Sequence, residues 1–146
     1  MERDAEVRQT AYRRFASSGR RPGLGEVAAD SCASAAEVRA AFRRLREQRL
    51  LVLEPDGETI RMAPPFSGVP TQHRVSSGGV EYFANCAWDA LGIPAALHRE
   101  GIVESRCEQT LEPLRLEVGV DGPEPSDWLF HCLVPAARWW QDIVFT

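Results

Sequence analysis

Residues 85–94, Asn-Cys-Ala-Trp-Asp-Ala-Leu-Gly-Ile-Pro, place a thiol close to a carboxyl group. They follow an alternating run, 80–84, that predicts a strand, and we expect them to make about two helical turns that stop at Gly92-x-Pro94. Cys86 and Asp89 are three residues apart, so on a helix they share one face. Unpaired amide groups and the helix dipole favour a thiolate in the first turn, where we expect Cys86. Cys86 and Asp89 together would combine a soft-metal ligand with a proton carrier.

The same pair has a plainer interpretation, because Cys-x-x-Asp spacing is common in proteins. Cys86 could be a packed thiol and Asp89 a helix-surface carboxylate. The other cysteines are distant, and no Cys-x-x-Cys or His-x-x-x-His pair is present. Reduced thiols are therefore expected rather than a disulfide framework or a structural zinc site. The four cysteines are Cys32, Cys86, Cys107 and Cys132.

The length of 146 residues suits one ordinary domain or two small ones. Apolar residues make up 44% and charged residues 26%, a balance typical of a folded globular protein rather than a disordered one. No apolar run approaches the ~20 residues that a membrane span needs. The charged start, Met1-Glu2-Arg3-Asp4, does not resemble a signal peptide, so we expect a cytoplasmic protein.

Residues 1–62 predict three helices followed by a β-hairpin. A helical stripe from Val7 to Ser18 ends at Gly19, and a short helix follows from Leu24 to about Asp30. Ser34 and Glu37 form a capping box that opens a third helix. A β run at 50–53, turn residues at 55–57 and a returning strand at 59–62 complete the plan of a winged helix-turn-helix.

An arginine-rich face on the third expected helix could enter a DNA groove, as the second helix of such motifs does. The same face carries Glu37 and Glu47, and residues 1–62 hold 12 arginines against 10 acidic residues. This small positive excess does not favour a nucleic-acid partner, and winged-helix units also serve as packing elements. The arginines are Arg39, Arg43, Arg44, Arg46 and Arg49.

Residues 63–70 are rich in proline and glycine and predict an extended linker to a second unit, 71–146. That unit should be a small mixed or antiparallel sheet, which makes the whole chain α+β. Expected strands lie at 71–75, 80–84, 101–106, 113–118 and 128–133, and Pro135 opens a last helix. Val144-Phe145 looks like the start of one more strand, so we expect the unit to be truncated at its C-terminus.

Three segments of the chain resemble alkylmercury (organomercurial) lyases in order and spacing. They are Phe66-Ser-Gly-Val-Pro-Thr-Gln-His-Arg-Val75, Tyr82-Phe-Ala-Asn-Cys-Ala-Trp-Asp-Ala-Leu-Gly-Ile-Pro94 and Val103-Glu-Ser-Arg-Cys107. The winged-helix unit ahead of them also fits the family. The core Cys-Ala-x-Asp-x-Leu-x-x-Pro is fairly specific, whereas the N-terminal unit is not.

The resemblance implies a cytoplasmic mercury-resistance enzyme that detoxifies organomercurials. It would cleave the carbon–mercury bond by protonolysis and release a hydrocarbon and Hg(II). By motif match, Cys86 is the thiolate that takes the metal, and Asp89 carries the proton. No cofactor is implied; Hg(II) is bound as product and low-molecular-weight thiols remove it. Cys107 matches a position that we expect to be structural and buried, and we expect Cys132 to pack in the core.

The family pattern also has a second catalytic cysteine on a strand just beyond the helix expected at 135–141. Residues 142–146 contain no cysteine. Two alternatives follow: the protein continues past Thr146, or this chain is an inactive lyase-like relic. A third is a regulator that binds a soft metal or DNA. Substrate preference and oligomeric state do not follow from the sequence.

Overall fold

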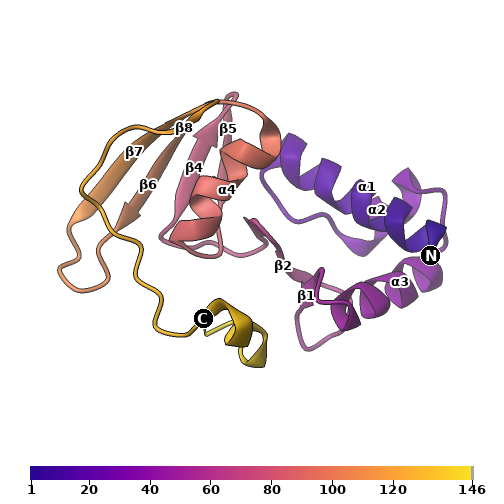
Figure 1. The fold of residues 1–146 in the computed structure, drawn as a ribbon. Helices are drawn as coiled ribbons and strands as arrows, with labels where there is room; N and C mark the ends of the chain where they lie inside the picture. Colours follow the sequence, from indigo (N-terminus) through magenta and orange to yellow (C-terminus); the bar gives the residue numbers. More distant parts are fainter. Residues whose placement is uncertain (146) are drawn as a thin grey trace.

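The chain begins with three helices and continues into two antiparallel sheets (Figure 1). The computed structural model describes residues 1–145. The α+β class expected from the sequence is confirmed. The helices are α1 (Glu2–Ser18), α2 (Leu24–Asp30), α3 (Ala35–Glu47) and α4 (Ala87–Leu97), with a 3-10 helix η1 (Ala136–Gln141). In the described residues, no helix has the length and apolar character needed to cross a bilayer.

The three N-terminal helices match their sequence signals. Phe15 of α1 and Phe42 of α3 are fully buried, so the apolar stripes of the two helices contribute to the core. The Ser34 hydroxyl accepts a hydrogen bond from the Glu37 amide, which confirms the predicted capping box. Gly19 closes α1 with a φ of 69°, and a Cβ there would lie 1.9 Å from the Glu81 carbonyl oxygen. Glycine therefore lets the end of α1 lie directly against β5 (Val80–Phe83).

The first sheet consists of β1 (Val52–Leu53), β2 (Ile60–Ala63) and β3 (Phe66–Ser67), all antiparallel. The strands β1 and β2 were expected as a hairpin. Residues 63–70, expected as an extended linker, include the two-residue strand β3. Phe66 also makes an isolated bridge to Ala84, so this segment joins the first sheet to the region of the second.

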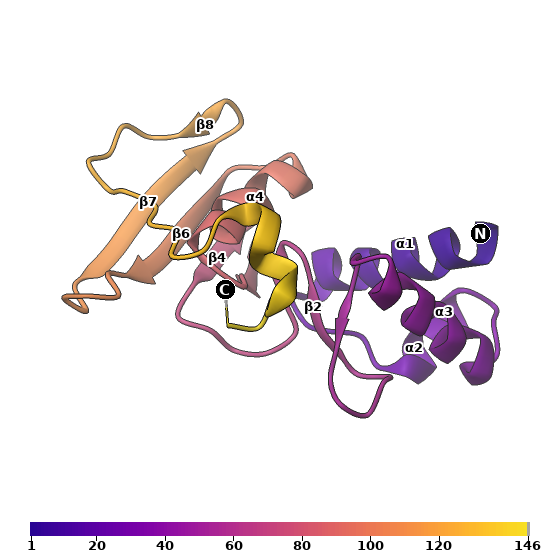
Figure 2. The same cartoon turned by 60° about the horizontal axis from the view of Figure 1, so that its bottom comes forward.

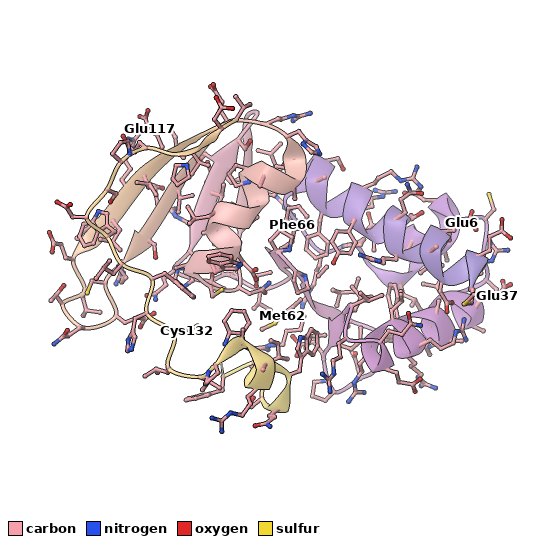
Figure 3. All side chains as sticks on the ribbon, in the orientation of Figure 1. Glu6, Glu37, Met62, Phe66, Glu117 and Cys132 are labelled. Atoms are coloured by element: carbon pink, nitrogen blue, oxygen red, sulfur yellow. The ribbon has the colours of Figure 1, made fainter. Side chains whose placement is uncertain are left out.

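Phe66 lies at the centre of an aromatic cluster, and Figure 3 shows it between α4 and α1. Its ring stacks on Phe15 with centroids 5.5 Å apart, and it lies 5.6 Å from Tyr82. Tyr12 meets it edge-on at 6.2 Å. These rings come from α1, β3 and β5, so the helices and both sheets share one apolar core.

The second sheet has the strand order β5-β4-β6-β7-β8, and α4 packs against it (Figure 1). The turn between β4 and β5 contains Gly78 and Gly79, both with positive φ, as the sequence predicts. Strands β6 and β7 lie where expected. Besides β5, the strands of this sheet are β4 (Arg74–Ser77), β6 (Gly101–Arg106), β7 (Pro113–Gly119) and β8 (Gly122–Pro123).

Helix α4 is longer than the sequence predicts. It continues through Gly92 and Pro94 to Leu97 and ends at His98, whose φ is 51°. Proline inside a helix removes one backbone hydrogen bond. Here Ile93 and Pro94 are buried against the sheet, and burial of these side chains offsets the lost bond.

The C-terminal segment departs most from the prediction. Residues 128–133 form no strand, because the last strand of the sheet, β8, ends at Pro123 and the chain continues as a loop. The last helix begins after Pro135, but as a 3-10 helix. Residues Val144-Phe145 lie in a turn rather than a strand, and Thr146 is outside the described residues. Figures 1 and 2 show the segment returning from β8 toward the N-terminal end of α4.

Replacing Phe66 with alanine should destabilise the protein by about 3–5 kcal/mol, because it opens a cavity where three elements meet. Urea denaturation measures the change. Phe145→Ala is the matched control: Phe145 is 73% exposed, so its loss should cost less than about 0.5 kcal/mol. Similar losses for the two variants would contradict the central position of Phe66.

Candidate active site

Cys86 caps the N-terminus of α4 at the point where the chain leaves β5. Its backbone is extended, with φ −152° and ψ 178°, and its sulfur accepts a hydrogen bond from the Asp89 amide at 3.4 Å. The chain just before Cys86 is held in place, because the Thr71 hydroxyl donates a hydrogen bond to the Ala84 carbonyl at 2.6 Å. Cys86 is half-buried. The sequence prediction that places Cys86 and Asp89 together at a strand-to-helix junction agrees with this geometry.

Asp89 is held in place by its neighbour Asn85. The Asn85 side-chain amide donates to Asp89 Oδ2 at 2.9 Å and to the Phe66 carbonyl at 3.2 Å. Burial raises the pKa of the Asp89 carboxyl, and the hydrogen bond from Asn85 partly opposes the rise. Because the effect of burial is the larger, Asp89 retains its proton at a higher pH than a surface aspartate does, as the sequence led us to expect.

The expected thiolate character of Cys86 is not what the structure gives. Burial raises the pKa of the Cys86 thiol above its ordinary value, and the negative charge of Asp89 raises it further. The hydrogen bond from the Asp89 amide acts in the other direction but is weaker than the burial effect. Desolvation therefore outweighs the helix N-terminus, and Cys86 needs a base to take its proton. The adjacent carboxylate of Asp89 is a suitable acceptor.

Two residues that the sequence analysis gave no role, Asn85 and Phe66, contact this site, and Tyr12 lies near it. Asn85 and Phe66 hold Asp89 and the start of α4, as described above. Tyr12 of α1 lies close enough to Asp89 for the carboxylate charge to raise the pKa of the Tyr12 hydroxyl, although burial is the larger cause. That hydroxyl donates to the Pro64 carbonyl at 3.0 Å. Asn85 could have been found from its four-residue spacing to Asp89, whereas no local pattern identifies Tyr12.

The other cysteines differ from their expected environments. Cys107 is half-exposed rather than buried, because β6 ends at Arg106 and Cys107 opens the following loop. Hydrogen bonding from the Thr110 hydroxyl is the main reason that the pKa of Cys107 is lowered. Cys132 is exposed rather than packed in the core, because its segment forms no strand.

A resident metal centre is not built into residues 1–145. No group of three or more histidine, cysteine, aspartate or glutamate side chains in this part of the chain is arranged to hold a metal ion. Cys86 has one carboxyl neighbour, Asp89, and that carboxyl is occupied by Asn85.

Comparison with known proteins identifies the family of this chain. The model of the family "Alkylmercury lyase" matches residues 66–146, which include β3, both site residues and the whole second sheet. The chain belongs to the alkylmercury lyase family. The family assignment made from the three sequence segments is thereby confirmed.

Two curated alkylmercury lyases, from Bacillus cereus and Clostridium butyricum, are each 37% identical to the chain over 70 residues. The match covers 46% of this chain and 32% of each relative, so the chain spans about a third of their length. A crystal structure titled as the mercury-bound form of MerB2 is similar with a TM-score of 0.67 and 23% identity. That similarity covers 87% of this chain and 60% of the other and shows a shared fold.

Asp89→Asn should make the protein more stable at neutral pH. The folded-state pKa of Asp89 is raised above 3.8, so the folded protein binds this proton more tightly than the unfolded chain does. Stability is then lost as the pH rises from about 3.8 through the folded-state pKa, and asparagine removes that loss while still accepting from Asn85. Urea denaturation at several pH values measures the difference, which should vanish in acid.

Asp4→Asn is the control of opposite sign. The hydrogen-bonded Arg44 guanidinium lowers the pKa of Asp4, so this carboxylate stabilises the fold above pH 3.8 and less so as the pH falls. Its replacement should therefore destabilise the protein at neutral pH. A destabilised Asp89→Asn variant with the same pH profile as Asp4→Asn would show that Asp89 is an ordinary ionised surface group.

Proposed function

We propose that this protein cleaves the carbon–mercury bond of organomercurials by protonolysis, with Cys86 as the metal ligand and Asp89 as the proton carrier. The observation that carries the proposal is a half-buried thiol whose sulfur accepts from the amide of an aspartate of raised pKa. Family membership supports it, as do the printed names of the relatives, which are alkylmercury lyases. The structural neighbour is described as mercury-bound.

The arrangement suits two balanced steps. In the first, an R–Hg⁺ ion forms a sulfur–mercury bond with Cys86, and the thiol proton passes to the Asp89 carboxylate. In the second, the carbon–mercury bond breaks, its electron pair stays on carbon, and the Asp89 carboxyl gives its proton to that carbon. The products are the hydrocarbon, an ionised Asp89 and Hg(II) on the Cys86 sulfur.

The soft character of mercury explains why sulfur is needed, since Hg(II) prefers thiolate to oxygen or nitrogen ligands. The metal is substrate and product here, and the proposal requires no cofactor. External low-molecular-weight thiols would bring the organomercurial and remove Hg(II) from Cys86. We place this detoxification, a part of mercury resistance, in the cytoplasm.

The first 62 residues serve, in this proposal, as a winged-helix unit that packs against the catalytic part. Residues 63–70 connect it to the lyase-like unit at 71–146 and contribute β3 to the first sheet. The Tyr82 hydroxyl, which donates to the Ala16 carbonyl, and the Phe15–Phe66 stack hold the two parts together. A packing role also explains why Tyr12 of α1 lies near Asp89.

The proposed lyase activity is tested by incubating the protein with phenylmercury and an excess of a small thiol. Gas chromatography measures the benzene released. The wild-type protein should release benzene, and Cys86→Ser should lose turnover because oxygen binds mercury poorly. Asp89→Asn should slow release by about 10²–10⁴-fold, the usual contribution of a positioned acid. Cys107→Ser, which changes a half-exposed thiol outside the site, is the control and should retain activity.

No benzene from the wild-type protein would contradict the proposal and favour an inactive lyase-like relic. Full activity in Asp89→Asn would remove Asp89 from the mechanism. Equal losses in Cys86→Ser and Cys107→Ser would show that the thiols act through stability alone.

A DNA-binding regulator is less well supported by the contacts of α3. Arg39 pairs with Glu58 at 2.6 Å, and Arg44 pairs with the largely buried Asp4 at 2.7 Å. These ion pairs withdraw positive charge from the face that would meet phosphate. We therefore expect no retardation of duplex DNA in a gel shift at 50 mM salt, whereas phosphate contacts would give binding that falls steeply with salt.

A further inference from the structure

Arginine side chains lie along one row across the exposed face of the second sheet. Arg74 of β4 is directly opposite Glu104 of β6, and Glu104 is opposite Arg115 of β7. Partners in antiparallel strands point to the same face of a sheet, and Arg106, two residues after Glu104, shares that face. Val75, the residue after Arg74, points the other way and is fully buried on the side where α4 packs. The three arginines therefore lie on the face that is turned away from α4.

The row borders a pocket in which positive charge is concentrated. The pocket has a volume of about 500 Å³, a size that suits a small-molecule ligand, and Arg74, Arg106 and Arg115 all line it. Residues 63–146 hold 5 arginines against 11 acidic residues, so an otherwise acidic part of the chain gathers most of its arginines here. Glu104 is the one acidic residue of the lining. A cleft in which one sign of charge dominates attracts ligands of the opposite sign, so the pocket favours an anion.

The arginines are available to such a ligand. In the described part of the chain, no carboxylate forms an ion pair with Arg106. Arg74 pairs with Glu104 at 2.9 Å and Arg115 pairs with Glu117 at 3.2 Å, but the side chains of both pairs are roughly half exposed. Because exposed ion pairs contribute little to stability, a ligand carboxylate can replace either glutamate. Arginine suits this exchange, since its guanidinium binds a carboxylate through two parallel hydrogen bonds.

The pocket lies at the end of the second sheet where α4 begins. Arg74 is paired with Phe83, the last residue of β5, and Cys86 follows three residues later. Thr71 also lines the pocket, and its hydroxyl donates to the Ala84 carbonyl at 2.6 Å. A ligand in the pocket is therefore held at the same end of the sheet as Cys86, although on the face opposite α4.

We propose that this pocket binds a small thiol that carries two carboxylates, and that such anionic thiols are the preferred thiol partners of Cys86. The inference rests on the proposed function, in which external thiols bring the organomercurial and remove Hg(II). One ligand carboxylate pairs with Arg106, and the other displaces a glutamate from Arg74 or Arg115. In the exchange that removes mercury, the incoming thiol forms a sulfur–mercury bond, the Cys86–mercury bond breaks, and the proton of the incoming thiol passes to the Cys86 sulfur. A neutral thiol makes the same exchange without the ion pairs.

Binding is measured by NMR titration of the backbone amides in the reduced, metal-free full chain, with mercaptosuccinate as the ligand. Succinate, which has the two carboxylates without the thiol, and neutral 2-mercaptoethanol are the reference ligands. Both dianions should shift the amide signals of β4, β6 and β7 in a saturable way, whereas 2-mercaptoethanol should not. Added salt should weaken the binding of the dianions, because it screens exposed charges.

Two variants of the pocket should change the affinity in opposite directions. Arg106→Gln should weaken the binding of both dianions about 5–10-fold, because it removes one charge-assisted pair. Glu104→Gln should strengthen binding about 2–5-fold, because it removes the negative charge of the lining and frees Arg74. Arg99→Gln is the matched control: Arg99 lies beside Gly78, at the other end of β4, and its loss should leave binding unchanged. Circular dichroism checks that the variants remain folded.

The choice of thiol partner is tested in the benzene-release assay by varying the thiol concentration. In Arg106→Gln, the mercaptosuccinate concentration that gives half-maximal turnover should rise about 5–10-fold, with kcat unchanged. The concentration of 2-mercaptoethanol that gives half-maximal turnover should stay the same. An indirect effect on the structure around Cys86 would change the requirement for both thiols alike.

The anion site is overturned if neither dianion gives saturable shifts, if Arg106→Gln binds as well as wild type, or if Glu104→Gln binds more weakly. An equal change for the two thiols in the assay would overturn the assignment of the thiol partner. Binding and turnover are scored separately. Saturable binding without benzene release defeats only the proposed lyase activity, and benzene release without binding of either dianion defeats only the anion site.

Discussion

The position of Phe66 is the constraint on which the rest of the structure depends. Its backbone pairs with Ala63 in the first sheet, bridges Ala84 at the end of β5, and accepts a hydrogen bond from Asn85. Its ring stacks on Phe15 of α1. One residue therefore joins the helices, the first sheet and the point at which α4 begins. Since Cys86 and Asp89 follow directly from that point, the core packing of Phe66 also determines where the site lies.

Asp4 and Asp89 show how a charged partner and desolvation give opposite properties to the same residue type. Asp4 and Asp89 are both aspartates near helix N-termini, yet Arg44 lowers the pKa of Asp4 while desolvation raises that of Asp89. The first carboxylate stabilises the fold, whereas ionisation of the second costs stability; in the proposed mechanism, the raised pKa of Asp89 suits proton transfer. Desolvation also raises the pKa of the Cys86 thiol. The negative charge of Asp89 raises the pKa of the Cys86 thiol, and in the proposed mechanism a proton passes from this thiol to Asp89 when the metal binds the sulfur.

Local signals in the sequence predicted local structure well. Gly19 ends α1, Ser34 caps α3, and the pair Gly78-Gly79 turns the chain between β4 and β5, because each signal acts within a few residues. The resemblance in three segments gave the family correctly.

Features that depend on distant partners were not predictable in this way. The length of α4 was underestimated because burial of Pro94 against the sheet outweighs its missing hydrogen bond. The sign of the Cys86 pKa shift was wrong because desolvation exceeds the helix-terminus effect. Tyr12 is brought near Asp89 only by the tertiary fold.

The protonation of Asp89 is the physical basis of the whole account, and it can be measured directly. Carbon-13 NMR of the aspartate carboxyl groups, with the Asp89 signal assigned by its absence in Asp89→Asn, follows the titration of this one group. The account predicts a midpoint clearly above the ordinary value of 3.8. A midpoint at or below that value would mean that burial beside Cys86 does not raise the pKa of Asp89, and it would contradict the account of the site.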